Sequence, residues 1–220
     1  MKVDRALARQ RWLDQVLGES YAIAPLAGDA SFRCYFRVED EHQHYVLMDA
    51  PPPHEDVSLV LAVRSWFARA GIRVSRLFAE DLEQGFLLLE DLGDRTWAAC
   101  CEARGDLSPL FEDGLRQLHL LQQSDPEMAL PIFDVARMRR ECDLYLDWYL
   151  PNVAGVEVSA EMRQQFHHSL TDSVACIAAL PQVPVHLDYH SRNLMLPAGE
   201  LPLGVIDYQD AVLGPVTYDL

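Results

Sequence analysis

Hydrophobic and polar positions follow two different spacings along the chain of 220 residues, one typical of helices and one typical of strands. Residues 3–17 place apolar side chains on one helical face, which predicts an amphipathic helix that ends at Gly18. Short apolar-rich stretches bounded by turn residues follow, and a helix over 55–70 interrupts them. The predicted strands cover residues 21–26, 31–39, 44–49, 74–78 and 85–90. This part of the chain therefore predicts a five-stranded antiparallel sheet.

The spacing of apolar residues becomes helical after Glu90. Four helices are predicted, over residues 96–103, 107–123, 134–150 and 160–180. We therefore predict an α+β protein with two lobes, a β-rich lobe over 1–91 and a helical lobe over 92–220. A ligand site is expected in the cleft between them.

The charge balance excludes several classes of partner. With 34 acidic residues against 18 basic ones, the formal net charge is −16, which argues against non-specific binding of nucleic acid or anionic lipid. Five cysteines without a C-x-x-C pair indicate reduced thiols rather than a disulfide framework or a zinc site. The first residues lack an apolar signal core, and no apolar run approaches the roughly 20 residues of a membrane span. We expect a cytoplasmic protein that binds neither nucleic acid nor membranes.

Residues 185–207 carry the side chains best suited to chemistry. Asp188 follows a short apolar stretch, where a carboxylate could accept the proton of a substrate hydroxyl. Asn193 lies five residues later, and Asp207 a further 14 residues on. The apolar stretches 194–196 and 203–206 predict a hairpin that brings Asn193 and Asp207 side by side. Their oxygens suit Mg²⁺, and the three residues together form the layout that phosphoryl transfer needs.

A purely structural interpretation of these residues is also open. Asp and Asn favour turns because their side chains bond the neighbouring backbone, so Asp188 and Asn193 taken alone fit ordinary loop positions. The position of Asp207 at the end of the second predicted hairpin strand favours the catalytic interpretation. We interpret His186, in the same segment, as an orienting or core residue.

Four segments carry a resemblance to a known family. They are GDASFRCYFRV (28–38), LLLEDLGDRTW (87–97), HLDYHSRNLM (186–195) and VIDYQDAVLGPVTYDL (205–220). They resemble the aminoglycoside phosphotransferase-like branch of the protein-kinase-like fold, and within it the bacterial anomeric kinases of N-acetylmuramate and N-acetylglucosamine, which feed cell-wall recycling. The resemblance implies an antiparallel β-sheet N-lobe that binds ATP and a mainly helical catalytic C-lobe.

The resemblance also implies roles for the residues of the catalytic segment. Asp188 would be the catalytic base, and Asn193 with Asp207 would bind Mg²⁺. Asp219 would support the catalytic loop from beneath. The chain stops at Leu220, whereas relatives in this family continue into further helices, so the C-lobe is expected to be truncated.

On the nucleotide side, the resemblance implies a hinge and a phosphate loop. The hinge, residues 90–92 with Glu90 and Leu92 at its ends, would meet adenine through its backbone. The loop over the phosphates would contain Gly28, Asp29 and Ser31, although Gly28 alone also fits an ordinary hairpin turn.

The chain departs from the family at the cation that normally pairs with the phosphates. Met48 stands where the wider fold usually has a lysine, and Lys2 is the only lysine present. We hypothesise that Arg33 or Arg37 supplies this charge, because alternation along a strand places residues 33, 35 and 37 on one face. A pair of solvated strand arginines is the alternative interpretation.

The sequence predicts an ATP- and Mg²⁺-dependent kinase acting on a sugar, and the acceptor class follows from the resemblance. Arg192 is one candidate partner for the lactyl carboxylate of N-acetylmuramate, and a surface ion pair is its alternative role. Asp210 could contribute to a site for a polycationic aminoglycoside. The aromatic run YLDWY (145–149) could stack on a sugar, but residues at this helical spacing more often belong to the core. The alternative functions are an aminoglycoside or other small-alcohol phosphotransferase, or a truncated nucleotide-binding protein without turnover.

Overall fold

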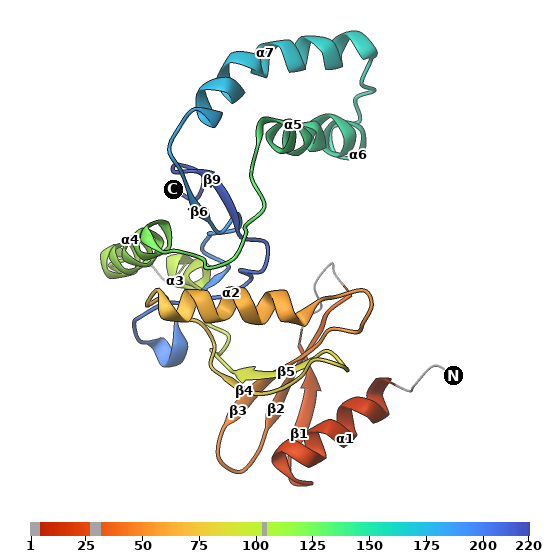
Figure 1. Cartoon of the computed structure of the whole chain (residues 1–220), viewed down its shortest axis with the longest axis vertical. Coiled ribbons are helices and arrows are strands. Elements are labelled where there is room, and N and C mark those ends of the chain that lie inside the picture. The colour runs from red at the N-terminus through yellow and green to blue at the C-terminus, as the bar shows by residue number, and fades with distance from the viewer. Residues whose placement is uncertain (1–4, 27–31, 103–104) are drawn as a thin grey trace. The chain divides into compact units, whose positions relative to one another are not determined.

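The computed structural model describes residues 5–26, 32–102 and 105–220 (Figure 1). Its residues form two compact units, one from 1–117 with 190–209 and the other from 118–189 with 210–220. The first unit thus contains more than the predicted β-rich lobe, because 92–117 and 190–209 pack with it. The division at residues 91 and 92 into a nucleotide-binding and a catalytic lobe concerns function and stays a prediction.

The first unit is built on an antiparallel sheet with strand order β1-β2-β3-β5-β4, which confirms the predicted sheet. Its strands are β1 (Ala22–Pro25), β2 (Cys34–Glu39), β3 (His44–Asp49), β4 (Leu77–Asp81) and β5 (Phe86–Glu90). β4 begins three residues later than predicted. The preceding Ser75 instead uses its carbonyl oxygen to accept a hydrogen bond from Arg64 Nε at 2.7 Å.

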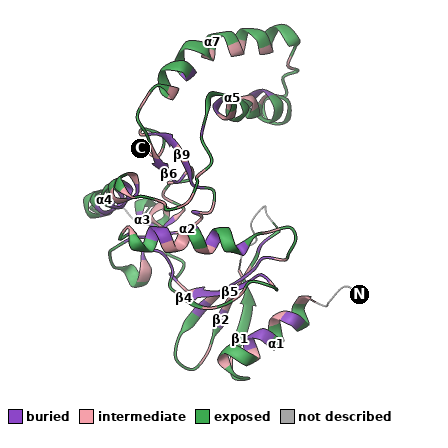
Figure 2. Cartoon of the chain, viewed as in Figure 1, coloured by how far each residue is buried: buried purple, intermediate pink, exposed green. Residues whose placement is uncertain are grey.

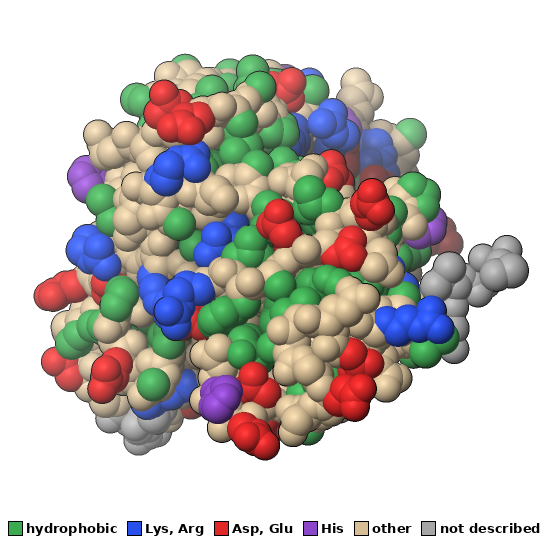
Figure 3. Space-filling model, turned by 60° about the horizontal axis from the view of Figure 1, so that its bottom comes forward, with side chains coloured by type: hydrophobic (Ala, Val, Ile, Leu, Met, Phe, Trp, Pro, Cys, Tyr) green, Lys and Arg blue, Asp and Glu red, His purple; other side chains and the backbone are tan. Residues whose placement is uncertain are grey.

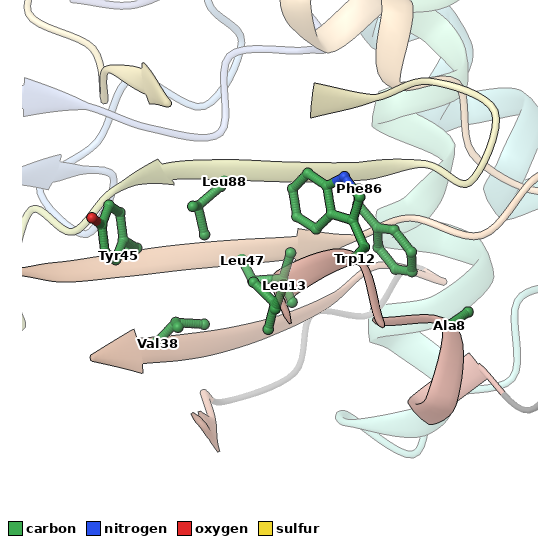
Figure 4. Packing of buried hydrophobic residues seen from close by; sticks show 8 residues of the cluster. All are labelled: Ala8, Trp12, Leu13, Val38, Tyr45, Leu47, Phe86 and Leu88. Carbon is green, nitrogen blue, oxygen red and sulfur yellow. The ribbon is translucent and has the colours of Figure 1, made fainter. Parts of the chain in front are cut away.

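One face of the sheet is buried against the opening helix α1 (Arg5–Leu17). Trp12 stacks on Phe86 with ring centroids 5.4 Å apart, and Figure 4 shows the other apolar side chains of this cluster between the helix and the strands. The carboxylate of Asp49 on β3 is 3% exposed. It accepts hydrogen bonds from Arg5 Nε at 2.7 Å and from Arg9 at 3.1 Å, which fixes α1 on the sheet.

The second helix, α2 (Val57–Arg69), lies on the opposite side of the sheet from α1 (Figure 1). Asp56 caps its first turn by accepting the Ser58 N–H. Its buried side chains are Val57, Val60, Val63, Trp66 and Phe67. On β2, β3 and β5, every second side chain points toward this side, because neighbouring residues of a strand point to opposite faces of the sheet.

A hairpin and two helices complete the first unit. The predicted hairpin is confirmed, since β7 (Leu194–Met195) and β8 (Gly204–Val205) pair antiparallel on either side of the turn η2 (Pro197–Gly199). Helix α3 (Trp97–Glu102) precedes α4 (Ser108–Gln123), which continues into the second unit. Both helices were predicted within one or two residues of these bounds.

A buried polar network connects α4 to the hairpin. The side chain of Gln117 is 1% exposed. Its Oε1 accepts the Arg73 N–H at 2.9 Å, and its Nε2 donates to the Leu203 carbonyl oxygen at 2.6 Å. Asp113 accepts from Gln117 Nε2 at 2.9 Å and from the Leu203 N–H at 2.8 Å. These bonds give the buried amide of Gln117 and the buried carboxylate of Asp113 hydrogen-bond partners within the protein.

The second unit combines a helical region with a small sheet. Its elements are α5 (Val135–Leu144), the π-helical turn η1 (Tyr145–Tyr149), α6 (Leu150–Asn152), α7 (Ala160–Ala178), β6 (Gln182–Val185) and β9 (Val212–Pro215). The predicted helix over 134–150 is therefore continuous but contains a π turn. β6 pairs antiparallel with β9, a pairing that the sequence did not predict. Most of α7 is exposed (Figure 2).

The aromatic run at 145–149 does not belong to the core, which corrects the favoured interpretation of its spacing. Tyr145, Trp148 and Tyr149 are all exposed, and of this turn only Leu146 is buried. A π turn holds more residues than an α turn, so side chains beyond it no longer follow the buried face of α5. No described helix is both long and apolar enough to cross a membrane.

We predict that Gln117→Ala lowers the free energy of unfolding by roughly 2–4 kcal/mol, because the buried Arg73 N–H and Leu203 carbonyl lose their partner. Urea denaturation followed by circular dichroism measures the change. The matched control is Gln123→Ala, at an exposed position of the same helix, which should change stability by less than about 0.5 kcal/mol. Equal losses in the two variants would contradict the role of the network.

Candidate active site

The first unit contains a cavity of about 360 Å³ on the α2 side of its sheet. One wall is formed by alternate strand residues, Tyr35, Arg37, Val46, Met48 and Leu89. The predicted site residues Arg37, Glu90, Leu92, Asn193 and Asp207 all line this cavity. The structure therefore brings together five residues that are up to 170 positions apart in the sequence.

The β7–β8 hairpin places the two predicted metal ligands at its open end. Leu194 pairs with Val205, and one position further the Ile206 N–H donates to the Asn193 carbonyl oxygen at 3.1 Å. Asp207 follows with φ +64°, a left-handed conformation that is uncommon for residues other than glycine. Its Oδ1 accepts a hydrogen bond from Gln209 Nε2 at 2.9 Å.

These two residues offer few protein ligands for a metal. Among the described residues, no group of three or more His, Cys, Asp or Glu side chains could hold a metal ion. Asn193 and Asp207 would supply one neutral and one charged oxygen. This donor set fits Mg²⁺, which commonly keeps several waters and takes further ligands from substrate phosphates. It does not fit a site that binds its metal with protein groups alone.

The predicted catalytic base, Asp188, lies in the second unit on a strained loop. The preceding Leu187 has φ +79°, which costs on the order of 1–3 kcal/mol for such a residue. Asp219 stabilises this backbone, since its carboxylate accepts the His186 N–H at 2.7 Å and the Leu187 N–H at 3.1 Å. The predicted support of the catalytic loop by Asp219 is confirmed. The Asp188 side chain itself is exposed.

His186 has the structural role expected of it. Its side chain is fully buried, and its Nδ1 accepts the Asp188 N–H at 3.3 Å. The ring also packs edge-on against Tyr189, with centroids 5.7 Å apart. The imidazole therefore fixes the backbone next to Asp188.

Burial raises the pKa of the Asp219 carboxyl to about 6. The two N–H groups that it accepts lower the pKa, and the nearby charge of Asp188 raises it, but burial has the larger effect. The support of the loop is thus a group whose charge changes below neutral pH.

An ion pair and a backbone hydrogen bond hold the Glu90 side chain of the predicted hinge. The Glu90 carboxylate accepts from Arg73 at 2.6 and 2.8 Å and from the Arg76 N–H at 3.0 Å. The hydrogen bond to Arg73 chiefly lowers the pKa of Glu90. The Glu90 backbone is also engaged, since its N–H donates to the Arg76 carbonyl oxygen at 2.8 Å.

The structure separates the two arginines proposed as phosphate partners. Arg37 lines the cavity and bonds Asp91 at 2.6 Å and Asp94 at 2.7 Å, so two carboxylates already balance its charge. These hydrogen bonds raise the pKa of Arg37, that of Asp94 being the largest cause, and they lower the pKa of Asp94. Arg33 precedes β2, is largely buried, and lies 3.7 Å from Glu55. Met48 is buried and lines the cavity, as its strand position implied.

The remaining predicted residues are not part of the cavity wall. Gly28, Asp29 and Ser31 lie outside the described residues. Arg192 and Asp210 are exposed, and neither lines the cavity. Their proposed roles toward an acceptor stay predictions.

Sequence reasoning missed several residues that shape the site. Asp91 was expected only as part of the hinge and Asp94 was given no role in the site, although two acidic residues at a predicted hinge are a signal for a basic partner. Tyr208 directly follows Asp207, lines the cavity and packs on Phe67 of α2 with ring centroids 5.4 Å apart. Burial raises the pKa of its phenol. No local pattern indicated that Gln117 and Arg73 would meet.

A family model described as the phosphotransferase enzyme family matches residues 22–220. Two curated relatives are named N-acetylmuramate/N-acetylglucosamine kinase. The one from Pseudomonas aeruginosa is 41% identical, with coverage of 95% of this chain and 64% of the relative. The one from Neisseria meningitidis is 33% identical, with coverage of 99% and 66%. The chain thus spans slightly less than two thirds of the length of these relatives.

Solved structures with a similar fold are more distant in sequence. Aminoglycoside phosphotransferase APH(2'')-Ib bound to ADP has a TM-score of 0.69 and 15% identity, with coverage of 99% of this chain and 74% of that one. An ethanolamine kinase from Plasmodium vivax has a TM-score of 0.59 and 14% identity, with coverage of 98% and 64%. These similarities confirm the predicted protein-kinase-like fold.

Asp219 predicts a pH dependence of stability. Its pKa rises from the ordinary 3.8 to about 6 in the folded chain, so between these values the folded chain binds more protons than the unfolded chain. Stability from this group is present at low pH and is lost as pH rises through about 6. Asp219→Asn removes the titration. The unfolding free energy of the native chain minus that of the variant should fall by roughly 1–3 kcal/mol from pH 4 to pH 6.5. A difference that rises with pH would refute the assignment.

We also predict that Arg37→Ala weakens ATP binding by roughly three- to tenfold, because residues 91–94 lose their anchor to β2 and must be ordered by the ligand. Titration calorimetry measures the dissociation constant without relying on turnover. Arg76→Ala is the matched control, since Arg76 is an exposed arginine beside the hinge and does not line the cavity. An unchanged affinity in Arg37→Ala would show that the ion pairs do not preorganise the hinge.

Proposed function

The chain belongs to the phosphotransferase enzyme family, and we propose that it is an ATP- and Mg²⁺-dependent sugar kinase. The reaction transfers the γ-phosphoryl group to the anomeric hydroxyl of N-acetylmuramate or N-acetylglucosamine. The acceptor follows from the names of the curated relatives at 33–41% identity. The observation that carries the proposal is that the predicted hinge residues Glu90 and Leu92 line the same cavity as Asn193 and Asp207.

The cavity has the character of a nucleotide site. Its apolar lining includes Val46, Met48 and Leu89 from the sheet and Met195 and Ile206 from the hairpin, which suits the two faces of an adenine ring. The hinge would supply backbone groups to the edge of the ring. ATP supplies the phosphoryl group, and the chain supplies the surface that orients it.

The proposed metal ligands, Asn193 and Asp207, line the same cavity. The oxygens of Asn193 and Asp207 would hold Mg²⁺ against the nucleotide phosphates, where the cation neutralises the charge of the transferred group. The left-handed conformation of Asp207 sets where its carboxylate points. Gln209 restrains that carboxylate through its hydrogen bond to Oδ1.

Asp188 would act on the acceptor. As a carboxylate it would accept a hydrogen bond from the sugar hydroxyl, orient the oxygen toward the γ-phosphorus and take up the proton as the new bond forms. The bonds of His186 and Asp219 to the loop fix the backbone from which this side chain projects. We propose that the enzyme works in the cytoplasm on a small-molecule sugar.

A panel of acceptors tests the proposed function. ADP release is measured with N-acetylmuramate, N-acetylglucosamine, choline and an aminoglycoside, and phosphorus NMR identifies the phosphorylated position. We expect turnover with the two N-acetylated sugars and an anomeric phosphate product. Turnover with only the aminoglycoside or choline would replace the proposed acceptor, and ATP binding without any turnover would favour a nucleotide-binding protein.

Two variants separate the roles within the site. Asp188→Asn should reduce the turnover number by at least about 100-fold while the affinity for ATP with Mg²⁺ stays within about twofold, because the base does not hold the nucleotide. Asp207→Ala should instead weaken Mg²⁺-dependent binding of ATP. A fully active Asp188→Asn enzyme would refute the assignment of the base.

A further inference from the structure

Arg137 on α5 is a fixed cation that the proposed reaction does not yet use. Arg37, Arg73 and Arg163 are paired with carboxylates, whereas no carboxylate of the described residues lies within ion-pair distance of Arg137. Its guanidinium lies over the Phe133 ring instead, with Cζ 5.4 Å from the centroid.

Phe133 connects this arginine to the catalytic loop within the second unit. The Phe133 N–H donates to the Leu213 carbonyl oxygen of β9 at 2.8 Å, and Leu213 pairs with Pro184 of β6. Three residues after β6 the chain reaches Asp188. The guanidinium is therefore connected through Phe133 to the β6–β9 sheet, and β6 leads into the loop that carries Asp188.

A second connection runs through the end of the chain. Tyr218 packs edge-on against Phe133 with ring centroids 4.8 Å apart, and the next residue, Asp219, holds the backbone before Asp188. Burial chiefly raises the pKa of the Tyr218 phenol, with further contributions from nearby carboxylates that include Asp188, and Arg137 lowers it. The positive charge of Arg137 and the negative charge of Asp188 thus both act on one phenol. Such charges are strongly screened beyond about 10 Å.

Several carboxylates lie near the base. Asp188 and Asp219 are neighbours, and Glu141 lies one helical turn after Arg137 and adds to the negative charge near Tyr218. An acceptor that carries a carboxylate would be repelled by these groups. An arginine near these groups offsets part of that repulsion, and its guanidinium can form two parallel hydrogen bonds to a carboxylate.

We propose that Arg137 binds the lactyl carboxylate of N-acetylmuramate and so determines the preference of the kinase for this acceptor over the neutral N-acetylglucosamine. The proposal rests on the proposed function and adds to it a specificity residue for the acid sugar. The packing of the guanidinium on Phe133 restricts its motion before the sugar binds, which reduces the entropy lost on binding. N-acetylglucosamine lacks the carboxylate and gains nothing from the arginine.

The two sugars provide an internal control for the experiment. Initial rates give kcat/KM for each sugar, and the quantity compared is the ratio of N-acetylmuramate to N-acetylglucosamine. Arg137→Gln should lower this ratio by roughly ten- to hundredfold, as expected for a lost charge-assisted pair, while N-acetylglucosamine changes by less than about threefold. Arg137→Lys keeps the charge but lacks the planar guanidinium, so its ratio should lie between that of the native chain and that of Arg137→Gln.

Two further arginines serve as comparisons. Arg139→Gln changes an exposed residue of the same helix and should leave the ratio unchanged. Arg192→Gln tests the other candidate partner of the carboxylate. An altered ratio in Arg192→Gln with an unchanged ratio in Arg137→Gln overturns the proposal, and so does an equal loss for both sugars in Arg137→Gln.

Binding of each sugar without nucleotide, measured by titration calorimetry, separates failure of this inference from failure of the proposed function. If the native chain phosphorylates neither sugar, the proposed function fails. If Arg137→Gln weakens the binding of N-acetylmuramate alone, the proposal for Arg137 is still supported. If each sugar binds the native chain and the variant with the same affinity, the proposal is overturned.

Discussion

Arg73 is the residue on which the cavity depends, because three of its groups act on different parts of the first unit. Its guanidinium holds Glu90 at the hinge, its N–H is fixed by Gln117 of α4, and its carbonyl oxygen accepts the Val205 N–H of β8 at 2.7 Å. The hinge and the hairpin with the proposed metal ligands are therefore positioned from one point. The two parts are thus joined by hydrogen bonds to the same residue.

Of the four non-glycine residues with left-handed conformations among the described residues, two lie where chemistry is proposed. Leu187 and Asp207 have left-handed conformations, one directly before the proposed base and the other at the proposed metal ligand. Such conformations persist only where surrounding contacts enforce them. Asp219 does so for the first by accepting two N–H groups, and the hairpin pairing at Ile206 does so for the second. These hydrogen bonds offset the free-energy cost of the two left-handed conformations.

Charge in this acidic chain is organised locally rather than as one field. On the face drawn in Figure 3, acidic and basic side chains of the described residues are interspersed. Where arginines serve the site, carboxylates hold them, as Asp91 and Asp94 hold Arg37. The exposed ion pair between Arg37 and Asp94 adds little stability by itself, so its effect is to hold these two side chains in place. Arg137, held by an aromatic ring, retains its charge for a ligand.

The sequence alone determined the features that depend on local spacing: the five strands, the hairpin of 194–205, and the proximity of Asn193 and Asp207 that follows from it. It also placed Tyr35 and Arg37 on one face, because strand alternation is a property of the backbone. Only the tertiary structure decided that Arg37 bonds Asp91 and Asp94, that Gln117 joins Arg73 to Leu203, and that β6 pairs with β9. These partners are between 27 and 86 positions apart, and which residue meets which is set by packing that no local period encodes.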